Sequence, residues 1–169
     1  MRARSRRANK KTGLPDGAVR AYYRSPIGVI EVVGTERGIS SLDFAGRAKA
    51  HAGPIPPLLA ECVNEIDEYF SGRRKAFSLL LDLQGTDFQK AVWQELLKVP
   101  FGTTTSYGAI ARALKNKQAM RAVGGANRRN PVSIIVPCHR VIGADGSLTG
   151  YGGGLSRKKW LLEHERKHA

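Results

Sequence analysis

The chain has 169 residues, of which 41% are hydrophobic and 25% charged, and these ordinary values exclude a wholly disordered protein. The length suits one domain, or a small domain packed against a compact one. No run approaches the roughly 20 apolar residues of a membrane-spanning helix, so we expect no membrane-embedded segment. The formal net charge of +14 at pH 7 makes a polyanion the first partner to consider.

The positive charge is unevenly distributed along the chain. Residues 1–12 contain six Lys/Arg and no acid, residues 13–109 contain ten against eleven acids, and residues 110–169 contain twelve against three. A field of this kind attracts nucleic acid, and an acidic membrane surface is the alternative partner. The simplest reading of surplus Lys/Arg is solubility alone, so charge by itself does not decide the function.

The first residues form a basic leader. MRARSRRANKK lacks the apolar core of a secretory signal, which gives no reason to expect export. A transit peptide is one interpretation, and a flexible basic arm over residues 1–17 is the one we favour. The two cysteines, Cys62 and Cys138, form no CxxC motif, so we expect free thiols and neither a disulfide framework nor a zinc knuckle.

Short β-favouring runs separated by turn residues come next, at residues 21–24, 29–33 and 39–44, and predict an antiparallel meander. Apolar residues then recur at helical spacing from Leu58 to Phe70, which predicts an amphipathic helix. Cys62 lies on the apolar stripe of this helix, so we interpret it as a core residue without chemistry.

Helical signals dominate from residue 86 onward. Thr86 and Gln89 have the form of a capping box, which predicts a helix from Asp87 to about Val99. We place a domain boundary near residue 85, which divides the chain into an arm (1–17), an amino-terminal domain (18–85) and a carboxy-terminal domain (86–169).

A pair of short helices follows, with Ser106 as the predicted N-cap of the first. The expected helices, 107–114 and 118–127, are joined by a tight turn in a basic region, which is typical of a helix-turn-helix. Many protein cores contain such pairs, so the motif alone leaves DNA binding open.

The β-branched run 132–136 predicts a short buried strand or extended segment, which stops at Pro137-Cys138-His139-Arg140. Cationic neighbours favour a thiolate over a thiol, and an ordinary thiol with a pKa of ~8.5 is mostly protonated at neutral pH. Cys-His pairs also arise by chance, so the pair by itself does not establish a nucleophile.

The remaining residues surround this pair with further features. Asp145-Gly146 predicts a two-residue hairpin, and the glycine run 150–154 is either a close approach to a ligand or a flexible linker. A helix is expected from Leu155 or Ser156 to about Arg166. Its Glu165 could orient His139, as a third group orients the base in a nucleophile relay.

The run IIVPCHRVIGADGSLTGYGGGLSRKKWLLEHE resembles the active-site region of the O6-alkylguanine-DNA alkyltransferases, whose hallmark is PCHR. DFQKAVWQELLKVPFGTTTSYGAIA and RAVGGANRRNP resemble the family's preceding helix and helix-turn-helix. The resemblance is continuous from Thr86 to Glu165, and the first half matches only in layout. It implies an α+β fold, with a small antiparallel sheet plus helix (ribonuclease-H-like) in front of a mostly helical domain with a helix-turn-helix.

The resemblance also implies roles for individual residues. Cys138 is the alkyl acceptor, His139 the base acting through a water, and Glu165 the residue that holds His139. Tyr107 donates toward the guanine ring and crowds the phosphate of the flipped nucleotide, and Asn130 ties the recognition helix to the active-site turn. Arg121 fills the vacated place in the base stack. The implied DNA-contacting residues are Tyr107, Arg121, Ala122, Gly124, Gly125, Ala126 and Arg128, and the implied base pocket is lined by Cys138, Val141, Tyr151, Gly152 and Gly153.

The expected partner is double-stranded DNA, bound through the minor groove by a monomer that could cluster cooperatively on DNA. A base inside a duplex is out of reach of a buried thiol, so the lesion must be turned out of the stack. The expected reaction moves an alkyl group from O6-alkylguanine, and O4-alkylthymine is a further candidate, irreversibly onto Cys138. It needs no cofactor. The expected compartment is the cytoplasm, or the nucleus in a eukaryote.

The sequence departs from the family pattern at two points and leaves two other hypotheses open. Ser133 stands where many relatives have proline, and only Cys62 and His51 are available for the zinc that some relatives bind, so we expect no metal. A binding module that recognises lesions without repairing them lacks the acceptor cysteine, which Cys138 argues against. A cysteine hydrolase using Cys138 and His139 would leave the basic second half unexplained.

Overall fold

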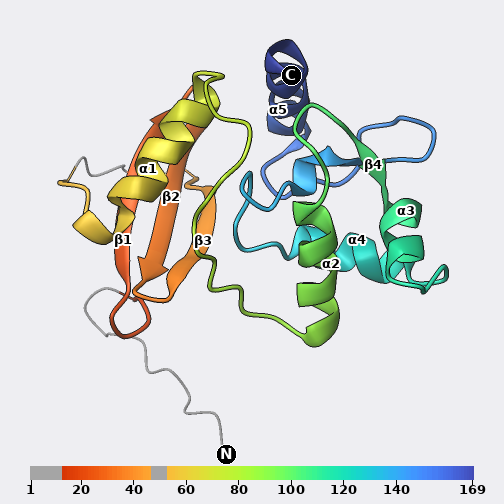
Figure 1. The fold of residues 1–169 in the computed structure, drawn as a ribbon, viewed down its shortest axis with the longest axis horizontal. Helices are drawn as coiled ribbons and strands as arrows, with labels where there is room; N and C mark the ends of the chain where they lie inside the picture. Colours follow the sequence, from red (N-terminus) through yellow and green to blue (C-terminus); the bar gives the residue numbers. More distant parts are fainter. Residues whose placement is uncertain (1–12, 47–52) are drawn as a thin grey trace, which may run out of the picture.

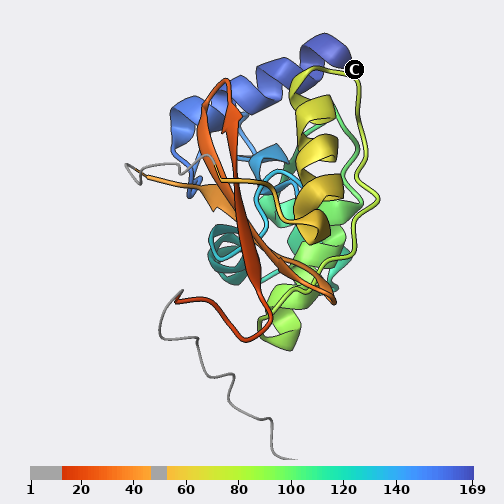
Figure 2. The same ribbon diagram turned by 90° about the vertical axis from the view of Figure 1, so that its left-hand side faces the viewer.

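A computed structural model describes residues 13–46 and 53–169 of the chain as two packed halves (Figure 1). The first half is a three-stranded antiparallel sheet in the order β1 (Val19–Ser25), β2 (Gly28–Thr35) and β3 (Gly38–Phe44). Helix α1 (Pro57–Phe70) covers one face of this sheet (Figure 2). The predicted meander and its helix are therefore confirmed, with strands a few residues longer than expected.

The core of the first half follows from the alternation of side chains along its strands. Ile30 and Val32 of β2 and Leu42 of β3 are fully buried, and they pack beneath the apolar face of α1. Cys62 lies on that face and is buried, as the helical spacing predicted. The turn between β2 and β3 ends at Gly38, whose φ of +129° favours glycine.

Residues 71–86 connect the two halves in an extended path along the open edge of β3. Leu81 forms a parallel bridge with Ile39. The buried carboxylate of Glu65 on α1 accepts hydrogen bonds from the amide and hydroxyl of Ser78 and pairs with Arg74 at 3.2 Å. The connection is thus anchored to the first half along its length.

The second half contains the three expected helices, α2 (Asp87–Leu97), α3 (Tyr107–Ala113) and α4 (Met120–Arg128). The capping box of Thr86 and Gln89 is formed, and the Ser106 side chain accepts from the amide of Ala109 at 3.1 Å. Lys115 turns the chain between α3 and α4 with a φ of 56°. The helix-turn-helix expectation is confirmed; α3 ends one residue earlier than expected, and α4 begins two residues later and ends one residue later.

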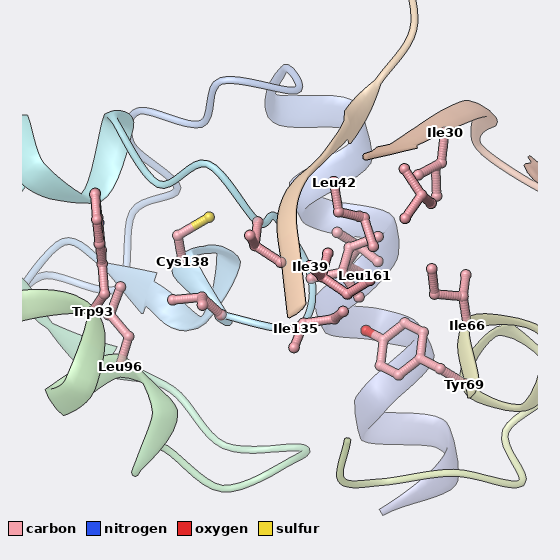
Figure 3. Close-up of a cluster of buried hydrophobic side chains, with 14 of the residues drawn as sticks. Ile30, Ile39, Leu42, Ile66, Tyr69, Trp93, Leu96, Ile135, Cys138 and Leu161 are labelled. Carbon is pink, nitrogen blue, oxygen red and sulfur yellow. The ribbon is translucent and has the colours of Figure 1, made fainter. Parts of the chain in front are cut away.

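Helix α5 (Leu155–His168) lies between the two halves in Figure 1 and runs across the top of both in Figure 2. It follows η1 (Cys138–Arg140) and the short strand β5 (Val141–Ile142), which pairs in parallel with β4 (Thr105–Ser106). The buried side chains of both halves form one continuous cluster that includes Cys138 and Leu161 (Figure 3). None of the helices in the described ranges is long and apolar enough to cross a membrane.

Three expectations about local structure are corrected. Residues 132–136 are a buried turn and not a strand, because Val136 bonds back to Val132 and Ile134 adopts a φ of 73°. Asp145-Gly146 forms a turn closed by Gly143 N and Ser147 O at 2.8 Å, but no hairpin follows because β5 pairs with β4 instead.

The third correction concerns the basic arm. Residues 1–12 lie outside the described residues. In the remaining part of the predicted arm, residues 13–17, the side chain of Leu14 is only 9% exposed. The end of the segment predicted to be a flexible arm is therefore packed against the fold.

Candidate active site

The thiol of Cys138 is buried at the start of η1, directly after the tight turn 132–136. Its residue is 4% exposed, and its amide donates to the carbonyl of Val136 at 2.8 Å. Burial raises the pKa of this thiol to about 11, although the Asn130 amide and the Lys158 ammonium act in the opposite direction. The expectation that adjacent cations favour a resting thiolate is therefore wrong for this conformation.

Two asparagines at the end of α4 hold the turn that presents the thiol. Asn130 donates from Nδ2 to the carbonyl of Val136 at 2.8 Å and accepts from the amide of Val132 at 3.0 Å, so it spans both ends of the turn. Asn127 donates to the carbonyl of Cys138 at 3.4 Å. The structure thus brings Asn130 to the expected place and adds Asn127, which sequence reasoning missed.

His139 and Glu165 meet in the interior although 26 residues separate them. His139 Nε2 lies 2.7 Å from Glu165 Oε1, and both side chains are buried. The other ring nitrogen, Nδ1, is also buried and makes no hydrogen bond with any residue of the described ranges. Burial lowers the pKa of His139 below its ordinary value, against the opposing attraction of the Glu165 carboxylate.

Glu165 is held by several donors besides His139. Arg140 donates from Nε to Oε2 at 2.8 Å and from Nη2 to Oε1 at 2.9 Å, which is a bidentate pair. The amide of Gly102 and the hydroxyl of Tyr69 complete the set, at 3.1 Å and 2.8 Å. Burial alone would raise the pKa of Glu165, but His139 and Arg140 outweigh it and hold the pKa well below the ordinary value. Arg140 therefore serves the carboxylate and not the thiol.

Lys158 is a second residue that sequence reasoning missed. Its ammonium is buried and donates to the carbonyls of Val141, at 2.5 Å, and Thr149, at 2.7 Å, which joins the two ends of segment 141–149. Burial lowers the pKa of Lys158, against the opposing effect of Cys138. The spacing Lys158, Leu161, Glu165 places all three on one face of α5, and that spacing was the available signal.

A cleft of about 620 Å³ lies beside this interior network, between α3, α4 and segment 149–150. The sequence-predicted residues on its lining are Tyr107, Arg121, Gly124, Gly125 and Arg128. The Tyr107 hydroxyl donates to the carbonyl of Thr149 at 3.3 Å across this cleft. Cys138 is not on its lining, so the thiol and this cleft do not form one open pocket.

Exposure divides the predicted DNA-contacting residues of α4 into two groups. Arg121, Ala122 and Arg128 are exposed, and Gly124 and Gly125 are half-buried. Ala126 is only 3% exposed, and its carbonyl accepts from Trp93 Nε1 at 2.9 Å. The expectation that Ala126 contacts DNA is therefore wrong in this structure, because it faces the core beneath α2.

The residues of the predicted base pocket lie along β5 and segment 151–153. Val141 is buried, and burial together with the neighbouring Cys138 raises the pKa of Tyr151. Gly152 has open space around it. A Cβ on Gly153 would lie 2.9 Å from the Phe44 ring, so the first half of the molecule packs directly against this segment.

Arg157 fixes the same contact from α5. Its guanidinium lies 4.4 Å from the centre of the Phe44 ring and donates to the carbonyls of Ile27 and Gly153 at 2.8 and 2.9 Å. Among residues 13–46 and 53–169, no three His, Cys, Asp or Glu side chains gather in a way that could hold a metal ion. His51, considered for a zinc site, lies outside these ranges.

The fold and site combine a helix-turn-helix with a buried cysteine that directly precedes a buried His-Glu pair. Comparison with known families agrees, because residues 87–167 match the DNA-binding domain of 6-O-methylguanine DNA methyltransferase and residues 18–83 match its ribonuclease-like domain. The curated methylated-DNA–protein-cysteine methyltransferase of Mycobacterium tuberculosis is 46% identical over 155 residues, with 88% of this chain and 94% of the relative covered. Its counterpart in Methanosarcina barkeri is 45% identical, with 87% and 98% covered.

Solved structures give the same result. The crystal structure of the M. tuberculosis O6-methylguanine methyltransferase is similar with a TM-score of 0.81 at 44% identity, covering 90% of this chain and 94% of that one. A crystal structure of the M. tuberculosis protein in complex with DNA is similar with a TM-score of 0.81 at 45% identity, covering 89% and 94%.

The chain belongs to the 6-O-methylguanine DNA methyltransferase family. It is a DNA-binding methyltransferase of direct-reversal repair, in which an alkyl group passes from DNA to a cysteine of the protein. The expected family, fold class and activity are confirmed.

Proposed function

We propose that Cys138 is the cysteine that accepts the alkyl group from the O6 atom of guanine, and that each molecule reacts once. The observation that carries this assignment is the 2.7 Å contact between His139 Nε2 and Glu165 Oε1. Because Glu165 is ionised, Nε2 carries the proton of the neutral imidazole and Nδ1 is left as the basic nitrogen. A base is thus prepared on the residue that follows the thiol.

The reaction begins with a protonated thiol, because the pKa of Cys138 is about 11. Ionising such a thiol at pH 7.5 costs about 5 kcal/mol, at roughly 1.4 kcal/mol for each pH unit. We propose that its proton passes through a water to Nδ1 of His139, while Glu165 stabilises the imidazolium that forms. The thiol therefore ionises in the complex with damaged DNA and stays protonated in the free protein.

The thiolate attacks the alkyl carbon in line with the carbon–oxygen bond. A carbon–sulfur bond forms, the bond to O6 breaks, and its electron pair leaves with guanine as an anion that takes up a proton. The Tyr107 hydroxyl stabilises this anion by a hydrogen bond, after giving up its hydrogen bond to the carbonyl of Thr149. A thioether is a poor leaving group, so the acceptor is consumed, and the atoms balance without a cofactor.

We propose that the protein binds as a monomer and that the exposed face of α4 enters the minor groove of the DNA. Clustering of several molecules along the DNA is a further part of the proposal. Ala122 is exposed and Gly124 and Gly125 are half-buried, and such small residues would allow close approach to the groove walls. In this proposal the exposed Arg121, which lines the cleft, enters the base stack. The lesion would be turned out toward segment 151–153, as a buried thiol requires. O4-alkylthymine is a further candidate substrate, and the compartment that holds the genomic DNA is the proposed site of action.

We also propose a division of the chain into a basic segment and two domains. A basic segment covers residues 1–17, with Leu14 packed against the fold. The first domain covers residues 18–85 and the second domain residues 86–169. The capped start of α2 at Thr86 supports the boundary, and so do the family matches on either side of it.

Intact-mass measurement tests the proposed acceptor. The protein is mixed with an oligonucleotide containing O6-methylguanine, and Cys138→Ser is the control. We expect a gain equal to one methyl group replacing one hydrogen, in the wild type alone and at no more than one equivalent. Turnover beyond one equivalent, or methylation of the Cys138→Ser variant, would refute the assignment.

A further inference from the structure

The amino-terminal half contacts the interior network through Tyr69, near the end of α1. Its hydroxyl donates to Glu165 Oε1 at 2.8 Å across a separation of 96 residues. Tyr69 and Glu165 are both fully buried. Figure 3 shows the hydroxyl of Tyr69 directed away from α1 and toward the second half of the core. The first half therefore makes direct contact with the residue that orients the proposed base.

The ring of Tyr69 is fixed by neighbours that do not need its hydroxyl. Phe70, Phe77 and Phe101 surround the ring with centroid distances of 5.4 to 6.0 Å. The carbonyl of Tyr69 lies 2.8 Å from His164 Nε2, which ties this turn of α1 to α5. A phenylalanine would make all of these contacts, so packing does not explain why the residue at position 69 carries a hydroxyl group.

The hydroxyl shares its acceptor with the proposed base. Oε1 of Glu165 accepts from Tyr69, from His139 Nε2 and from Arg140 Nη2, whereas Oε2 accepts from Arg140 Nε and Gly102. A third donor on Oε1 stabilises the carboxylate anion and weakens its pull on the His139 proton. The number of donors on Oε1 therefore affects how strongly His139 holds a proton.

We propose that Tyr69 is a positioning residue of the transfer reaction, which holds Glu165 and keeps His139 neutral at the pH of the reaction. This inference rests on the proposed role of His139 as the base. Other titratable groups near the pair are Cys138 and Arg140 of η1 and Lys158 and His164 of α5. Tyr69 contributes from α1, and burial followed by the Glu165 charge raises its pKa, so it remains a neutral donor at any working pH.

The sign of the effect follows from the charge on each partner. Tyr69→Phe removes a donor from the carboxylate, which then attracts the imidazolium more strongly and raises the pKa of His139. A base must be neutral to accept the thiol proton, so the acidic side of the pH–rate profile moves to higher pH. A shift of about 0.5 to 1 pH unit corresponds to a rate about three- to tenfold lower on the acidic side, with less than about twofold change near pH 8.5.

The experiment measures single-turnover methyl transfer by the full chain from pH 5.5 to 9, with saturating O6-methylguanine duplex. The end-point methyl incorporation counts the active molecules, so each rate refers to folded protein. Tyr23→Phe is the matched control, because the Tyr23 hydroxyl also donates to a carboxylate of α1, Asp67, at 3.0 Å but at an exposed position. We expect its profile to coincide with that of the wild type.

A profile for Tyr69→Phe that coincides with the wild type, or a uniform loss at every pH, would overturn the proposal. Site-specific 3-fluorotyrosine at position 69 provides a second measurement, because it keeps the ring and donates more strongly. We expect it to move the acidic side of the profile to lower pH, and a shift to higher pH would also overturn the proposal. If the wild type fails to methylate Cys138 at all, the proposed function fails instead, so the two failures are distinct.

Discussion

Replacement of Glu165 by glutamine tests the proposed relay most directly. The substitution keeps the shape of the side chain but removes the charge that stabilises the His139 imidazolium. A carboxylate next to a histidine changes its pKa by about one to three units, so the variant is expected to transfer methyl groups about 10 to 1,000 times more slowly at neutral pH. Single-turnover transfer from an O6-methylguanine duplex measures this rate.

The same variant is expected to lose stability. Arg140 is buried and its bidentate partner disappears, and leaving one member of a buried pair uncompensated costs about 3 to 5 kcal/mol. The pKa of Glu165 is lowered in the folded protein, so its contribution is present above the unfolded value and is lost as the pH falls through the folded value. The stability difference between wild type and variant should therefore be full at pH 7 and narrow in acid.

Glu65→Gln separates the two effects. Glu65 is also buried, pairs with an arginine at 3.2 Å and accepts two hydrogen bonds from Ser78, but these partners, Arg74 and Ser78, do not belong to the network of Cys138, His139 and Glu165. Chemical denaturation should show a lower free energy of unfolding for both variants, whereas the rate of methyl transfer per active molecule should fall for Glu165→Gln alone. Equal rates for the wild type and Glu165→Gln, or an equal fall for both variants, would refute the reasoning.

Three further predictions concern the DNA face, the segment beside the thiol and the buried lysine. Arg121→Ala should slow transfer from duplex DNA but leave the rate with the free base O6-methylguanine unchanged, and because Arg121 is exposed it should change the free energy of unfolding by less than about 0.5 kcal/mol; slowing with the free base would contradict an intercalating role. Gly153→Ala should lower the melting temperature, since its Cβ would lie 2.7 Å from the Tyr151 ring, whereas Gly152→Ala has open space and should change it little; equal melting temperatures would count against the packing of Phe44 on this segment. Lys158→Met should raise the pKa of the Cys138 thiol further, because the Lys158 ammonium acts against the effect of burial on that pKa. The pH dependence of thiol alkylation in the protein without DNA measures this pKa, and a lower pKa in the variant would contradict the reasoning.

The order and type of the main elements could be predicted from sequence because local signals agreed with the fold. The capping box at Thr86, the Ser106 cap and the apolar stripe of α1 each acted within a few residues of the element they define. The failure at residues 132–136 came from a side chain that competes with the backbone preference of the run. The run 132–136 looks like a strand by composition, but Asn130 bonds to both of its ends and turns it back on itself.

The site was predictable only in part, for a related reason. The motif around Cys138 and its family resemblance indicated the acceptor, the base and Glu165. The partners Tyr69, Asn127 and Lys158 are ordinary residues on helices, and only the packing of distant elements brings them to the site. The pKa of the thiol was also expected in the wrong direction, since sequence shows adjacent cations but shows neither their orientation nor the burial that outweighs them.

The burial of Cys138 also bears on what the protein withstands before it meets DNA. Thiolates that solvent can reach attack oxidants and electrophiles, and Cys138 is 4% exposed with a thiol pKa of about 11. A peroxide or a disulfide in solution therefore meets almost no reactive thiolate. In the proposed reaction each molecule reacts once, and the burial of Cys138 preserves its one acceptor thiol for a damaged base.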